Sequence, residues 1–118
     1  MSAVLVLVRG TPTQDVRARE AAEAALLFSA FTPQLSVLYS GDGVWQLLAG
    51  QQPDVIGAVS VASVIAAFPE YDIQRVYADA DALAVRGIAP GCLLPGVTLL
   101  ARDGIARLLA THAPVLTF

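Results

Sequence analysis

Runs of apolar residues alternate along the chain with amphipathic stretches, and the runs predict buried strands. The first run, Ala3–Val8, has six consecutive apolar residues, is rich in Val and shows no alternation of polar and apolar positions. Such a run is typical of a strand covered on both faces, as in a parallel sheet between helices. Similar patterns predict four further strands, at Leu35–Tyr39, Ile73–Ala78, Val97–Leu100 and Pro114–Phe118.

Helical patterns separate these strands. The first predicted helix begins at a capping box, in which Thr11 is the N-cap, Pro12 follows and Gln14 completes the motif, and it ends near Phe31. The other predicted helical segments are a short turn at Val44–Leu48, an at least partly helical stretch at Val55–Phe68, and helices at Asp79–Val85 and Arg102–Thr111. This order predicts one domain over residues 1–118, with a three-layer α/β/α, flavodoxin-like fold and a five-stranded, mostly parallel sheet.

The composition is richer in apolar residues and poorer in charged residues than that of a typical domain. Of the 118 residues, 56% are hydrophobic and 14% are charged, whereas typical domains have about half and about a quarter. The excess predicts that a partner covers part of the surface. The net charge of -3 and the lack of Lys argue against direct nucleic-acid binding. The uncharged stretch Val55–Pro69 falls short of the ~20 residues of a membrane span, so a cytoplasmic protein is expected.

Candidate chemistry is sparse. A single cysteine excludes a disulfide within the chain and a Cys-rich zinc site, and we expect no metal or cofactor. Cys92 has no charged neighbour within five residues, which favours a structural loop cysteine over a thiol nucleophile. His112, the only histidine, is expected to cap the last helix or lie on the surface.

Parallel strands place their ligand sites outside their carboxyl ends, where three predicted loops meet. Asp79 and Asp42 follow strands at this edge, and for Asp79 a helix cap is favoured over a general base or metal ligand. The loop Arg9–Thr13 offers an alternative function, a flavodoxin-like small-ligand site. Against this reading, Pro12 lacks an N–H donor and the loop has no glycine-rich phosphate motif.

Apolar residues near the only tryptophan are candidates for contact with a partner, because Trp is the strongest anchor at protein interfaces. The predicted interface consists of Trp45, Leu47, Leu48, Val61, Val64 and Phe68.

Specific motifs in the middle of the chain carry a family resemblance. The run Ser40–Asp54 reads SGDGVWQLLAGQQPD, Tyr71–Ile73 opens the third predicted strand, and Arg86-Gly87 closes the third predicted helix. With these features the chain resembles the TusC/DsrF branch of the DsrE/DsrF/DsrH sulfur-relay family. The resemblance implies a heterohexamer of two copies each of three related subunits, which passes persulfide sulfur between proteins. The partners would be DsrE/TusD-type and DsrH/TusB-type sister subunits.

The resemblance also implies where sulfur is carried. The principal sulfur-accepting cysteine belongs to the DsrE/TusD-type sister, and at the corresponding position this chain has Asp79, which cannot carry a persulfide. We therefore expect a non-catalytic subunit that is not an enzyme by itself, serving 2-thiolation of the tRNA wobble uridine. The alternatives are a Dsr-type sulfur-oxidation subunit and a persulfide carrier that uses Cys92.

Overall fold

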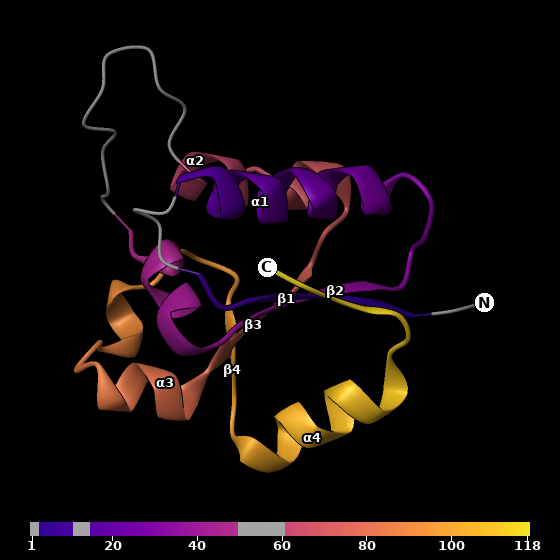
Figure 1. The fold of residues 1–118 in the computed structure, drawn as a ribbon. Coiled ribbons are helices and arrows are strands. Elements are labelled where there is room, and N and C mark those ends of the chain that lie inside the picture. The colour runs from indigo at the N-terminus through magenta and orange to yellow at the C-terminus, as the bar shows by residue number, and fades with distance from the viewer. Residues whose placement is uncertain (1–2, 11–14, 50–60) are drawn as a thin grey trace.

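The computed structural model describes residues 3–10, 15–49 and 61–118. Figure 1 shows the arrangement of its elements. The strands are β1 (Val4–Val8), β2 (Leu35–Tyr39), β3 (Arg75–Asp79), β4 (Thr98–Leu100) and β5 (Val115–Thr117). The helices are α1 (Asp15–Ser29), α2 (Val61–Ala66), α3 (Ala80–Val85) and α4 (Arg102–Thr111), and three short 3-10 helices are η1 (Gly41–Leu47), η2 (Phe68–Tyr71) and η3 (Pro90–Cys92).

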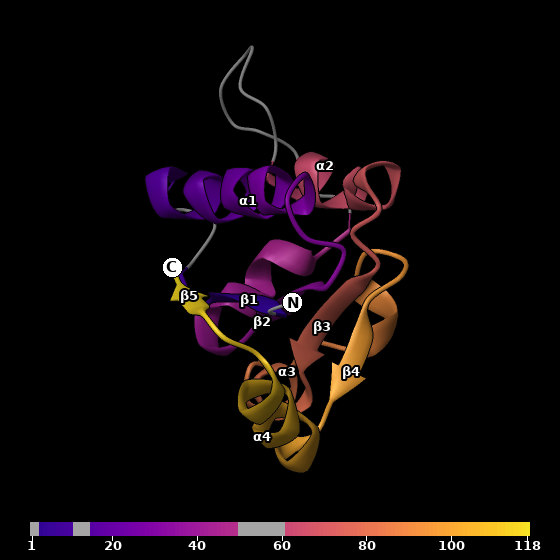
Figure 2. The same ribbon diagram turned by 90° about the vertical axis from the view of Figure 1, so that its right-hand side faces the viewer.

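The five strands form one sheet in the order β4-β3-β2-β1-β5, and every neighbouring pair is parallel. Helices α1 and α2 cover one face of the sheet, and α3 and α4 lie on the other (Figures 1 and 2). The predicted three-layer α/β/α fold with a parallel sheet is therefore confirmed. Because all strands run the same way, the loops after β1, β2 and β3 meet at one edge, the carboxyl edge.

The two faces of the sheet bury different cores. Along β1, Val4, Val6 and Val8 belong to the larger cluster, which also includes three alanines of α1. Small side chains at Ala21, Ala22 and Ala25 fill the positions of α1 within this cluster. Leu5 points to the other face and joins Leu38 and Leu108 in a smaller cluster beneath α4. Burial on both faces explains the unbroken apolar run of the first strand.

The structure shifts several predicted boundaries. Strand β3 begins at Arg75 instead of Ile73, because the Ile73 N–H donates to the Phe68 carbonyl and closes the η2 turn. Helix α1 ends at Ser29, and the chain continues through further turn hydrogen bonds to Thr32. The capping box at Thr11, Pro12 and Gln14 lies outside the described residues, as do residues 55–60 of the apolar segment.

Among the described residues, no helix has the length and apolar character needed to cross a membrane.

Candidate functional site at the carboxyl edge

Asp79 is the last residue of β3 and the N-cap of α3. One carboxylate oxygen, Oδ1, accepts hydrogen bonds from the backbone N–H groups of Asp81 at 3.0 Å and Ala82 at 3.3 Å. The other, Oδ2, accepts from the hydroxyl of Ser40 at 2.9 Å. Both oxygens are thus engaged, and the predicted helix cap is confirmed. The cap also ties the loop after β2 to the end of β3.

The turn after β2 fits tightly against the end of β1. Ser40 N–H donates to the Val8 carbonyl at 3.0 Å, and Gly43 N–H donates to the Ser40 carbonyl at 2.9 Å. A side chain at Gly43 would collide with the Val8 carbonyl, so only glycine allows this approach. Gly41 has a positive φ of 53°, which also favours glycine. These two glycines explain the Gly-Asp-Gly bend in the sequence.

Gln46 is a residue that sequence reasoning did not single out. Its side chain is 1% exposed, and Nε2 donates to the Gly10 carbonyl at 2.7 Å, which joins η1 to the segment after β1. Its Oε1 is buried and forms no hydrogen bond in the structure. The sequence signal that could have identified it is a polar residue within the apolar turn Val44–Leu48. Burying a polar side chain costs free energy unless the side chain forms a hydrogen bond, so a buried Gln indicates a specific partner.

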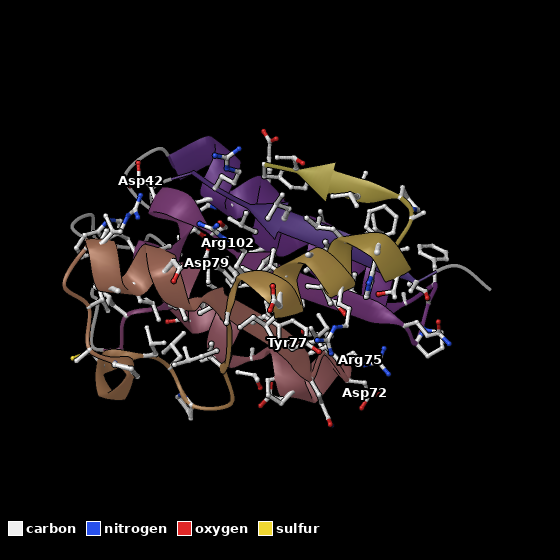
Figure 3. The ribbon with its side chains drawn as sticks, turned by 90° about the horizontal axis from the view of Figure 1, so that it is seen from below. Asp42, Asp72, Arg75, Tyr77, Asp79 and Arg102 are labelled. Carbon is white, nitrogen blue, oxygen red and sulfur yellow. The ribbon has the colours of Figure 1, made fainter. Side chains whose placement is uncertain are left out.

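Asp42 and Arg86 form a salt bridge between the loop after β2 and the end of α3. Arg86 Nη2 lies 2.9 Å and Nε 3.1 Å from Asp42 Oδ1, and Nη1 donates to the Ala82 carbonyl at 3.2 Å. Figure 3 shows Asp42 and Asp79 near one end of the molecule. Since the Asp42 side chain is 54% exposed, solvent screens this pair and its contribution to stability is small.

Cys92 is exposed and belongs to η3. Its carbonyl accepts from Ala49 N–H at 2.9 Å, and nearby Leu94 N–H donates to the Leu47 carbonyl at 2.8 Å. Together with an antiparallel bridge between Leu48 and Leu93, these bonds hold the cysteine loop against the end of η1.

His112 lies at the C-terminal end of α4, as expected. Its Nδ1 is 2.7 Å from the Leu108 carbonyl, and its Nε2 is 3.0 Å from the hydroxyl of Ser36 at the start of β2. Cys92 packs beside η1, which follows the other end of β2. The structure therefore does not bring the only cysteine and the only histidine together as a nucleophile and its base.

The predicted interface residues divide into three groups. Leu47 and Phe68 are fully buried in the chain's own core and do not reach the surface. The prediction that these two residues lie at an interface is therefore wrong. Trp45, Leu48 and Val64 are half-buried beside that core. The side chain of Val61 lies outside the described residues.

The 3-10 geometry of η1 explains why Leu47 is buried while Trp45 is only half-buried. Three residues complete one turn of a 3-10 helix, so side chains three positions apart lie on the same face. Val44 and Leu47 share the inward face and have no exposed area. Trp45 lies on a neighbouring face and is half-buried, as is Leu48, the C-cap residue directly after η1.

The remaining candidates offer little chemistry. Arg9 is exposed, with its backbone N–H bonded to the Phe118 carbonyl at 2.8 Å, and Thr11–Thr13 lie outside the described residues. Within the described ranges, no three His, Cys, Asp or Glu side chains gather as metal ligands.

Burial raises the pKa of the Tyr39 phenol above its ordinary value near 10 and keeps it neutral.

Comparisons with known proteins agree with this architecture. The crystal structure of the ychN protein from E. coli superimposes with a TM-score of 0.86 at 19% identity, covering 100% of both chains. A protein of unknown function from Bacteroides thetaiotaomicron, BT1422, gives a TM-score of 0.70 at 17% identity and covers 98% of this chain and 95% of its own. These likenesses establish the fold.

Sequence comparisons extend over the whole chain. A TusC homolog of Vibrio parahaemolyticus is 33% identical over 118 residues, and a TusC protein of Escherichia fergusonii is 33% identical over 119 residues. Each match covers 100% of both sequences. The model of the DsrE/DsrF-like family matches residues 2–118. The chain therefore belongs to the DsrE/DsrF-like family, as the motifs around Asp42 indicated.

Proposed function

We propose that this chain is a non-catalytic subunit of a cytoplasmic sulfur-relay complex that passes persulfide sulfur toward 2-thiolation of the tRNA wobble uridine. Membership of the DsrE/DsrF-like family and full-length similarity to proteins named TusC support a sulfur-relay role. In this account the chain packs against a DsrE/TusD-type sister, which owns the reactive cysteine, and against a DsrH/TusB-type sister.

The contacts of Asp79 are the observation that carries the non-catalytic role. At the position where the resemblance implies the sister's sulfur-accepting thiol, this chain has a carboxylate. Three hydrogen bonds, from Ser40, Asp81 and Ala82, use both of its oxygens to hold the loop and cap α3. A side chain engaged in this way serves the fold and has no thiol with which to accept sulfur.

Half-buried apolar side chains at the end of η1 supply the contact with the sister. Trp45 of η1, Leu48, which directly follows η1, and Val64 of α2 are partly buried and pack against the same core. Helix α2 packs against η1, so these side chains come from adjoining elements. We define Trp45, Leu48 and Val64 as the η1 surface. Burying aromatic and aliphatic anchors of this kind is a common source of interface energy.

Co-expression with the two sisters tests the complex. The chain is expected to co-purify with both sisters at equal stoichiometry, and Trp45→Ala is expected to weaken the contact at the η1 surface. A monomer that binds neither sister would contradict the proposal.

The tRNA branch of the proposal has its own measurement. Deleting the gene is expected to abolish 2-thiouridine at the wobble position in nucleosides hydrolysed from bulk tRNA, and the wild-type gene is expected to restore it. Normal 2-thiouridine together with impaired sulfur oxidation would assign the complex to the Dsr-type alternative.

A further inference from the structure

We draw no further inference here: the strongest candidate, the surface patch of exposed apolar side chains at Leu27, Phe31 and Tyr71 around the C-terminal end of α1 and the neighbouring η2, carries none, because nothing in the structure shows what covers it.

Discussion

The hydroxyl of Ser40 donates a 2.9 Å hydrogen bond to the carboxylate of Asp79, and this bond joins the ends of two neighbouring strands. With the two backbone N–H groups that Asp79 also caps, it fixes the start of α3. Replacing Asp79 with Ala removes all three bonds and is expected to lower the free energy of unfolding by about 2 kcal/mol. Urea denaturation measures the change.

A neighbouring carboxylate gives the control for this prediction. Asp81 is exposed in the first turn of α3, and the same substitution there is expected to cost about 0.5 kcal/mol or less. Equal losses at Asp79 and Asp81 would show that the cap and the Ser40 bond contribute nothing specific.

The close approach of η1 to β1 gives a second prediction. Gly43→Ala places a methyl group against the Val8 carbonyl and must displace the backbone, so we expect a loss of more than about 2 kcal/mol in thermal or urea unfolding. Gly91→Ala is the matched control, because nothing lies within 4 Å of the added carbon and Gly91 is not among the glycines with a positive φ. A Gly43→Ala protein as stable as Gly91→Ala would rule out this packing.

Burial of Tyr39 predicts a loss of stability in alkali. The raised pKa keeps the phenol neutral in the folded chain, while the unfolded chain releases the proton near its ordinary pKa of 10. The free energy of unfolding is therefore unaffected by this group below that pH. It falls above that pH, by up to about 1.4 kcal/mol per pH unit.

Tyr39→Phe isolates this effect. Urea denaturation on either side of the ordinary tyrosine pKa should show a smaller alkaline loss for Tyr39→Phe than for the wild type. Parallel losses in both proteins would mean that the phenol of Tyr39 ionises equally well in the folded state.

Elements with local signals were predictable from the sequence. Strand β2 and helix α4 have the bounds that their patterns predicted, because an apolar run and an amphipathic segment next to breaking residues are local features. The capping role of Asp79 was predictable for the same reason, since an acidic residue between a strand and a helix favours an N-cap.

Features that depend on distant contacts were not predictable. The partners Asp42 and Arg86 are 44 positions apart in the sequence, and Gln46 reaches Gly10 across 36 positions. Leu47 and Phe68 were predicted at an interface, yet both are core residues. The sequence pattern does not distinguish a 3-10 turn from an α-helical one, and the period of the turn decides which apolar residues of η1 face inward.

Cys92 gives the prediction that separates the leading proposal from its main alternative. Because the proposal assigns no sulfur to this chain, Cys92→Ser should assemble with both sisters and support wild-type levels of 2-thiouridine in tRNA. The exposed position of Cys92 makes the substitution compatible with folding. Loss of 2-thiouridine with an intact complex would establish the carrier role for this cysteine.

The most direct test of the non-catalytic role is to locate persulfide sulfur in the assembled complex. The complex of this chain with its sisters is loaded by a sulfur donor, blocked with an alkylating agent and analysed by peptide mass spectrometry. The proposal predicts persulfide on the cysteine of the DsrE/TusD-type sister and an unmodified thiol at Cys92. Persulfide at Cys92 that passes on to the next carrier would contradict it.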